Sequence, residues 1–368
     1  MIRSEFLVCF LILFSSLLIP SHGHRALPEK QAALFIFGDS LFDAGNNNHI
    51  NTTIDYQANF FPYGETFFKY ATGRHSDGRL IPDFIAEYAK LPLIPTFLPS
   101  TSHEFTFGVN FASAGAGALV ETHKGFVIDL KTQISYFKIV QKELKQKLGD
   151  ERTKTLLSRA VYLFSIGSND YIVPLLANSS VLHSDYSRKQ YVATVIGNLT
   201  ATIKDIYKKG GRKFGFVNLG QMGCFPASRL FVAGRTGACL EDASELAKLH
   251  NKALSEVLQE LESQLKGFKY ANHDFYNSGA ELFSNPSKYG FKKTTACCGS
   301  GPFRGFPSCG GKRSGLKDYE LCDNPDEYLF FDFSHPSEKA NKQISELMWS
   351  GTPDVTGPYN FKTLFELK

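Results

Sequence analysis

A serine, a histidine and an aspartate occupy positions from which they could carry out nucleophilic catalysis. Ser40 follows Gly38 and Asp39 at the end of a short apolar run, where a tight turn can project its hydroxyl into a cleft. Asp332 lies three residues before His335, in a turn ahead of a helical stretch. A serine hydroxyl needs a base to remove its proton, and an imidazole base needs a carboxylate to hold its tautomer. The sequence therefore offers the parts of a Ser-His-Asp triad for acyl transfer.

Each of these parts also has an ordinary structural explanation. Gly-Asp-Ser is common turn composition, and it lacks the Gly-x-Ser-x-Gly pattern of the widespread hydrolase elbow. Asp332 could cap a turn while His335 lies on the surface. Taken singly, the serine motif favours the turn interpretation, and the Asp/His pair favours neither.

Acyl transfer also needs hydrogen-bond donors for the oxyanion that develops on the attacked carbonyl. A glycine-rich turn at residues 113–117 can present backbone N–H groups, and Asn169 can add a side-chain amide. Close helix packing would explain the glycines, and a turn would explain the asparagine. Gly115 and Gly117 are both candidate donors, and the sequence does not decide between them.

Apolar runs that end at glycine or turn residues alternate with stretches of helical periodicity. The runs predict strands at residues 33–37, 109–112, 160–166, 214–219 and 269–275. The periodic stretches predict helices at residues 80–89, 130–148, 187–209, 242–265 and 337–348. This alternation predicts a parallel α/β sheet covered by helices on both faces, with ligands bound beyond the carboxyl ends of the strands. Residues 297–322 are expected to form a long disulfide-tied loop, and the residues after Gly351 a short surface tail.

The N-terminus has the pattern of an export signal. Arg3 precedes an almost wholly apolar segment at residues 7–19, Pro20 ends it, and residues 21–23 offer small side chains for cleavage. The segment is too short to span a bilayer comfortably, so residues 1–23 are predicted to be a signal peptide, with an N-terminal anchor as the alternative. No later stretch has the length of a transmembrane helix, and residues 24–368 are predicted to form a single domain.

Cysteine usage agrees with export. Cys9 lies in the predicted signal peptide, and an even number of cysteines in an exported chain predicts disulfides. The remaining six are Cys224, Cys239, Cys297, Cys298, Cys309 and Cys322. Adjacent Cys297 and Cys298 are expected to have different partners, but the full connectivity cannot be read from the sequence. Zinc is discounted because the chain has no Cys-x-x-Cys pair and no nearby histidine at ligand spacing.

The net charge bears on possible binding partners, and three sequons bear on glycosylation. The formal net charge is only +4, without long Lys/Arg runs, which weighs against nucleic acid. A slightly basic, solvated surface is the favoured interpretation, with attraction to acidic polysaccharide or anionic lipid as the alternative. Sequons permit N-glycosylation at Asn51, Asn178 and Asn198.

Four sequence blocks resemble those of the plant GDSL esterase/lipases, a family of the SGNH hydrolase superfamily. The similar blocks are residues 37–47, 108–117, 167–170 and 332–335, which occur in family order, and residues 72–79 are also family-like. The resemblance covers essentially the whole mature chain, and it is closest to the GDSL lipases linked to pathogen defence. The last block reads Asp-Phe-Ser-His, whereas close relatives often have proline at one middle position. That departure changes neither catalytic side chain.

The resemblance implies a role for each candidate residue. Ser40 would be the nucleophile, His335 its base and Asp332 the carboxylate that orients the base. The Ser40 N–H, the N–H of Gly115 or Gly117, and the Asn169 amide would form the oxyanion hole. The implied fold is a flavodoxin-like three-layer α/β/α sandwich. The implied activity is extracellular (apoplastic) hydrolysis of a small-molecule ester or lipid, without a metal or organic cofactor.

Two other classes of function stay open. A secreted acyltransferase would use the same residues and would differ only in the access of water and of an acceptor alcohol. A secreted binding or defence protein could use this scaffold with little catalysis, although it would have no need of an intact triad. The sequence sets neither the acyl chain length, nor the alcohol, nor the oligomeric state. Most of the 33 phenylalanines are expected in the core rather than in a lipid pocket.

Overall fold

A central six-stranded sheet organises the computed structural model, which describes residues 32–99, 104–311 and 313–367. Five strands run parallel: β1 (Leu34–Gly38), β2 (Gly108–Asn110), β3 (Val161–Ser165), β4 (Lys213–Val217) and β5 (Lys269–His273). Their spatial order, β2-β1-β3-β4-β5, is that of a flavodoxin-like doubly wound sheet. The predicted α/β fold class is confirmed. The predicted signal peptide lies outside the described residues.

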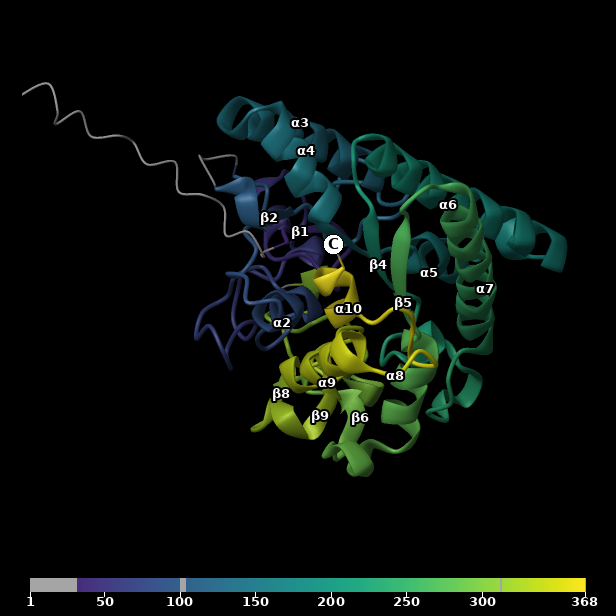
Figure 1. The fold of residues 1–368 in the computed structure, drawn as a ribbon. Helices are drawn as coiled ribbons and strands as arrows, with labels where there is room; N and C mark the ends of the chain where they lie inside the picture. Colours follow the sequence, from purple (N-terminus) through teal and green to yellow (C-terminus); the bar gives the residue numbers. More distant parts are fainter. Residues whose placement is uncertain (1–31, 100–103, 312, 368) are drawn as a thin grey trace, which may run out of the picture. The chain divides into compact units, whose positions relative to one another are not determined.

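Helices cover both faces of the sheet (Figure 1). One layer contains α3 (Leu130–Leu148), α4 (Asp150–Arg159), α5 (Ser168–Leu176), α6 (Asp185–Lys208) and α7 (Glu241–Gln264). The other contains α2 (Ile81–Tyr88), α8 (Phe275–Ser284), α9 (Glu338–Ser350) and α10 (Phe361–Glu366). This is the expected three-layer sandwich, although the short helices α4, α5, α8 and α10 were not predicted.

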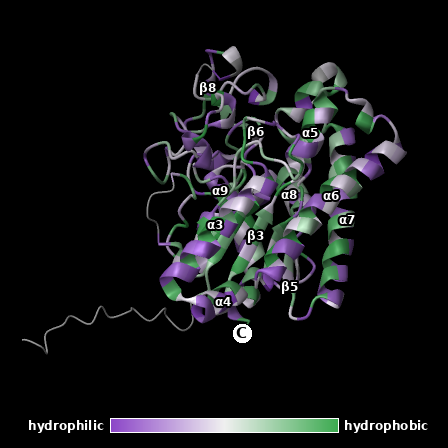
Figure 2. Cartoon of the chain, turned by 90° about the horizontal axis from the view of Figure 1, so that it is seen from above, coloured by the Kyte–Doolittle hydropathy of each residue, from purple (hydrophilic) through white to green (hydrophobic). Residues whose placement is uncertain are grey.

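The two faces of the sheet carry different cores because alternate side chains of a strand point to opposite faces. Toward α3 the strands present aromatic rings, and Phe164 stacks between Phe37 and Phe216 with centroid distances of 5.0 and 5.4 Å. Phe137 of α3 meets Phe35 edge-on at 5.3 Å. The opposite face is aliphatic and packs on α2 and α9; it includes Leu34, Ile36, Val161, Leu163 and Val217. Figure 2 shows hydrophobic residues along the strands and mixed faces on the covering helices.

The residues after Gly351 do not form the expected surface tail. They add a sixth strand, β10 (Thr356–Pro358), which pairs antiparallel with β5, and then helix α10. Phe361 of α10 is fully buried against Gly215 of β4, where a Cβ atom would lie 2.4 Å from the phenylalanine ring. The prediction was wrong because a three-residue strand and a six-residue helix are too short to show a periodicity.

Disulfides tie down the segment that precedes α9. The bonded pairs are Cys224–Cys239, Cys297–Cys322 and Cys298–Cys309. The different partners of Cys297 and Cys298 confirm that prediction. The expected loop also holds a small sheet, β7 (Cys298–Gly299) with β8 (Glu320–Leu321), and a second one flanks it, β6 (Lys293–Ala296) with β9 (Tyr328–Phe330). A disulfide in a loop of this size contributes about 2–4 kcal/mol by restricting the unfolded chain.

Residues 32–368 form one compact unit. This range covers all but the first few residues of the single domain that the sequence predicts after the signal peptide. Among the helices within the described ranges, none combines the length and the hydrophobicity needed to cross a bilayer.

Replacing Phe361 by alanine is expected to destabilise the fold by about 3–5 kcal/mol, because a buried ring is removed from its position over Gly215. Urea unfolding followed by circular dichroism measures this change. The matched control is Phe231→Ala, since Phe231 is 56% exposed and its removal should cost little. Equal stabilities of the two variants would contradict the role given to α10.

Candidate active site

The site begins at a tight turn after β1, where the winding of the sheet reverses between β1 and β3. Gly38 ends β1, and a Cβ atom there would lie 2.4 Å from the carbonyl oxygen of Ser165 on β3. Gln133 of α3 holds both backbone groups of this glycine: its Oε1 accepts from Gly38 N at 3.0 Å, and its Nε2 donates to Gly38 O at 2.8 Å. Only glycine allows this approach, and the turn leaves Ser40 half-buried at the carboxyl edge of the sheet.

Ser40, His335 and Asp332 form a continuous hydrogen-bonded chain, although 292 residues separate the serine from the aspartate (332 less 40). His335 Nδ1 lies 2.7 and 2.9 Å from the two carboxylate oxygens of Asp332. A proton on Nδ1 leaves Nε2 free to accept from the Ser40 hydroxyl, which lies 2.7 Å away. Asp332 Oδ1 also accepts from the backbone N–H groups of Ser334 and His335, so the turn itself fixes the carboxylate. The geometry therefore brings together the three side chains that the sequence singles out.

Two further side chains extend this chain beyond Asp332. The Tyr63 hydroxyl donates to Asp332 Oδ2 at 2.7 Å, and the Arg313 guanidinium donates to the Tyr63 hydroxyl at 2.6 Å. Arg313 also lies 3.9 Å from Asp332 Oδ2 and donates to the carbonyl of Gln57. Arg313 and Asp332 are completely buried. A buried cation thus compensates the buried carboxylate, directly and through a tyrosine.

These neighbours set the protonation of the site. Burial opposes ionisation of Asp332, but the attraction and hydrogen bond of His335, followed by Arg313, outweigh it and hold the pKa of Asp332 below its usual range. The buried ring of His75 lies 4.7 Å from that of His335. Burial, then His335 and Arg313, lower the pKa of His75 well below its usual value, which keeps it neutral. Burial raises the pKa of Asp39 to about 6, despite hydrogen bonds from Leu41 N and Ser168 Oγ.

The predicted oxyanion donors are arranged around the same turn. Asn169 begins the first turn of α5, and its Nδ2 donates to the carbonyl of Ala116 at 3.0 Å. Gly115 has a φ of +83°, and a Cβ atom at Gly117 would lie 2.3 Å from Asp170 Oδ1. Within the described residues, the amides of Ser40, Gly115 and Gly117 donate to no protein group. Packing therefore explains both glycines, and both keep a free N–H.

Side chains of the first family block (residues 37–47) hydrogen-bond to the backbone of the second (residues 108–117). Asn46 Nδ2 donates to the carbonyls of Asn110 and Ala112 at 3.0 and 2.8 Å. Asn47 Nδ2 donates to the carbonyl of Ala114 at 2.9 Å. Asp43 Oδ2 accepts from Ala114 N at 2.9 Å. The residues that follow Ser40 thus fix the glycine-rich turn beside it.

A cavity of about 200 Å³ opens at Ser40, Asn169 and His335. Its walls are largely apolar; apart from the three residues just named, they include Leu41, Ile172, Leu176, Leu219, Met222, Phe225, Phe275 and Phe330. Gly115 and Gly117 are not among its lining residues. An apolar cavity with a few convergent polar groups is the usual form of a small-molecule site.

Comparisons with known proteins identify the family. The family model described as "GDSL-like Lipase/Acylhydrolase" matches residues 34–348. The chain belongs to this family. It is 52% identical over 372 residues to "GDSL esterase/lipase 2" of Arabidopsis thaliana, covering 99% of both chains.

Two other family members are similar over nearly their full length. "GDSL esterase/lipase 1" of Arabidopsis thaliana is 54% identical, with 93% of this chain and 92% of the relative covered. "GDSL lipase" of Tanacetum cinerariifolium is 52% identical, with 92% and 89% covered. The resemblance seen in the four blocks is confirmed.

Sequence reasoning did not find Tyr63, His75 or Arg313. His75 lies inside the family-like residues 72–79, so its position carried a signal that was not interpreted. Tyr63 and Arg313 are 250 residues apart, and no spacing rule connects them. A lone arginine between Cys309 and Cys322 looks like part of a solvated loop, whereas here it is buried.

His250 of α7 packs against the third family block (residues 167–170) and the start of α5. Its Nδ1 lies 2.8 Å from the Tyr171 hydroxyl, and a Cβ atom at Gly167 would lie 2.8 Å from its ring. The ring therefore occupies the space that Gly167 leaves open at the start of α5. Burial lowers the pKa of His250 to about 3.

This depressed pKa predicts a pH-dependent stability. A histidine that stays neutral in the fold contributes stability that is present above its unfolded pKa of about 6.5 and is lost as the pH falls toward 3. His250→Gln should remove about 1.4 kcal/mol per pH unit from the slope of unfolding free energy below pH 6.5. Urea unfolding at a series of pH values measures the slope. His183→Gln, at an exposed histidine, should keep the wild-type slope; identical slopes for all three proteins would show that His250 is not the cause.

Proposed function

We propose that this chain is a secreted serine hydrolase of carboxylic esters, with Ser40 as nucleophile, His335 as base and Asp332 as the orienting carboxylate. The observation that carries the proposal is the 2.7 Å approach of Ser40 Oγ to His335 Nε2 while Nδ1 is held by Asp332. This arrangement can deprotonate the hydroxyl as it attacks. Relatives named esterases or lipases at about half identity support the ester as substrate class.

The reaction would proceed through an acyl-enzyme. Ser40 Oγ bonds to the ester carbonyl carbon while His335 Nε2 takes the hydroxyl proton. The tetrahedral intermediate collapses with loss of the alcohol, which receives that proton from His335. A water molecule then attacks the acyl-enzyme by the same route, releasing the acid and regenerating Ser40.

The oxyanion would be stabilised by the Ser40 N–H, the Asn169 amide and the N–H of Gly115 or Gly117. Donors fixed before the reaction need no reorganisation when charge develops on the carbonyl oxygen. The hydrogen bonds from the first block to Ala112 and Ala114 would keep the glycine turn in position. Asn169 would turn its amide from the Ala116 carbonyl toward the oxyanion or share it between them.

Tyr63 and Arg313 would act as positioning residues. During catalysis His335 becomes an imidazolium, which is stabilised only while Asp332 stays ionised and correctly oriented. The Tyr63 hydroxyl and the Arg313 guanidinium favour that ionised form from the side opposite to His335. Neither side chain would touch the substrate.

Secretion and glycosylation belong to the same proposal. Three disulfides fit an oxidising compartment, and the predicted signal peptide would direct the chain there. Asn51, Asn178 and Asn198 are all exposed, so each sequon is accessible to glycan attachment. For a plant protein this compartment would be the apoplast.

Ser40→Ala should lower the hydrolysis of p-nitrophenyl esters by about 10⁴–10⁶-fold, because the nucleophile is lost. The measurement uses secreted protein and p-nitrophenyl esters from acetate to palmitate. The matched control is Ser135→Ala on the exposed surface of α3, which should behave as wild type. Undiminished hydrolysis by the Ser40 variant would refute the assignment. If wild type cleaves no ester, a transferase with a specific acceptor or a binding protein would replace this proposal.

Tyr63→Phe should lower kcat/KM by about tenfold or more, because Asp332 loses a hydrogen bond to its charged form. Because a less firmly held Asp332 stabilises the His335 imidazolium less well in the transition state, the loss should fall on kcat, with KM little changed. The control is Tyr162→Phe, whose equally buried hydroxyl donates to the Leu157 carbonyl, away from the site. An unchanged kcat in Tyr63→Phe, or an equal loss of kcat in both variants, would argue against a positioning role.

A further inference from the structure

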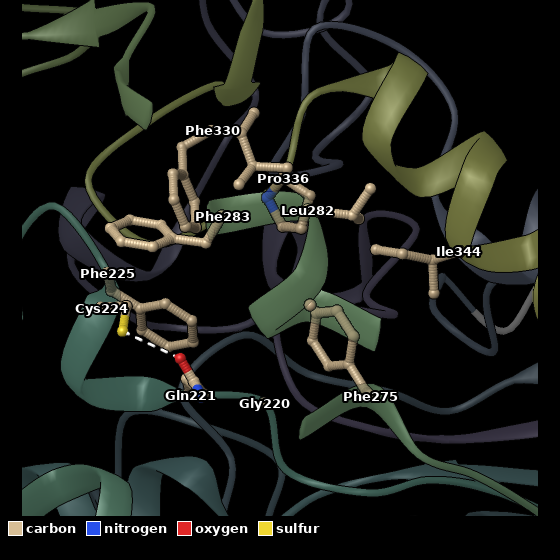
Figure 3. Close-up of a pocket in the computed structure, with 12 residues that line it drawn as sticks. Gly220, Gln221, Cys224, Phe225, Phe275, Leu282, Phe283, Phe330, Pro336 and Ile344 are labelled. Carbon is tan, nitrogen blue, oxygen red and sulfur yellow. Dashed lines mark hydrogen bonds between the residues drawn. The ribbon is translucent and has the colours of Figure 1, made fainter. Parts of the chain in front are cut away.

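A second, narrower pocket lies beside the catalytic cavity. It has a volume of about 30 Å³. Its twelve lining residues come from the loop after β4, from α8, from β9, from the turn between β9 and α9, and from α9. Figure 3 shows the rings of Phe225, Phe283 and Phe330 on one side, with Leu282 and Ile344 across from them. None of the twelve lining residues, all within the described ranges, is charged. The pocket suits an aliphatic group and offers nothing to bind an ion.

The narrow pocket adjoins the catalytic cavity. Both are lined by Gly220, Phe225, Phe275, Phe330 and Pro336. Pro336 directly follows His335, so this shared wall begins next to the base. A chain bonded to Ser40 would therefore pass these shared side chains to reach the narrow pocket.

The lining is largely apolar, and Gln221 is its polar side chain. Gln221 Oε1 lies 3.2 Å from Cys224 Sγ, the contact drawn as a dashed line in Figure 3. Cys224 is bonded to Cys239, so its sulfur has no proton to donate. The floor of the pocket is formed by Leu282 and Ile344, which are 2% and 1% exposed. Close-packed interiors rarely leave such a space unfilled beside a large cavity.

We infer that this narrow pocket is the subsite for the distal methylenes of an unbranched aliphatic acyl chain. The inference rests on the proposed function, since it needs an acyl group on Ser40. If the inference holds, the substrate is an ester whose acyl chain is longer than that of acetic acid. Each methylene that enters the pocket should raise kcat/KM by about fourfold, until the pocket is full.

The order of the reaction assigns the pocket to the acyl chain rather than to the alcohol. The alcohol must leave before water can attack, whereas the acyl group stays bonded to Ser40 through both steps. Apolar contacts over a buried floor would hold an alkyl alcohol in place and delay deacylation. The same contacts keep the acyl carbonyl in position while water approaches.

Filling the pocket tests the assignment. A Cβ atom at Gly279 of α8 would lie 3.2 Å from the ring of Phe275, at the junction of the two spaces. Gly279→Leu should therefore lower the ratio of kcat/KM for octanoate to that for acetate by about tenfold or more. The matched control is Gly197→Leu in α6, a helical glycine with open space around it, which should keep the wild-type ratio.

A second variant works in the opposite direction. Leu282→Ala enlarges the floor, so the chain-length optimum should shift toward longer p-nitrophenyl esters. The assay uses acetate, butyrate, hexanoate, octanoate, decanoate and laurate, and thermal unfolding confirms that each variant is folded. A parallel series of alkyl acetates varies the alcohol instead of the acyl chain.

The outcomes separate this inference from the proposed function. Opposite shifts of the two variants in the acyl series alone support the pocket as the acyl subsite. Unchanged ratios in both variants, equal losses on all esters, or shifts confined to the alkyl acetates overturn the inference. In those cases Ser40-dependent hydrolysis of acetate by the wild type would still uphold the proposed function, and its absence would overturn both.

Discussion

The ionised carboxylate of Asp332 is the constraint around which the site is built. It has no exposed surface, and an unpaired buried charge would cost several kcal/mol, on the order of the stability of a whole domain. The fold surrounds it with donors: two backbone N–H groups of its own turn, the His335 imidazole and the Tyr63 hydroxyl. Arg313 then supplies the opposite charge. The same groups that make its burial tolerable also fix the orientation of His335.

The disulfide-tied segment follows from this constraint. Arg313 lies between Cys309 and Cys322, at the start of a single 3-10 turn (Arg313–Gly315). The bonds from Cys297 and Cys298 anchor both sides of this backbone next to β9, which leads into Asp332. The arginine and the carboxylate are thus held on the same covalent framework. The disulfides therefore fix the position of one buried charge in addition to stabilising the fold.

The extent to which sequence predicts this molecule depends on the range of the interactions involved. Five parallel strands and the main helices were found because their periodicity is local. Ser40, His335 and Asp332 were singled out as a candidate triad because acyl transfer requires those residue types and the family blocks contain them. Tyr63, Arg313 and β10 were missed because their partners lie far along the chain: Tyr63 is 269 residues from Asp332. The choice between Gly115 and Gly117 stays open because packing requires glycine at both positions.

The turn that carries Ser40 and the narrow pocket are held from different faces of the sheet. The turn at Ser40 is fixed by Gln133 from the layer that covers the stacked aromatic rings. The narrow pocket instead lies between α8, α9 and β9, on the aliphatic side. Substitutions at Gly279 or Leu282 can therefore reshape the pocket without touching the hydrogen-bonded chain from Ser40 to Arg313. Pro336 is the exception, since it lines the pocket and directly follows His335, so a substitution there would affect both the pocket and the histidine.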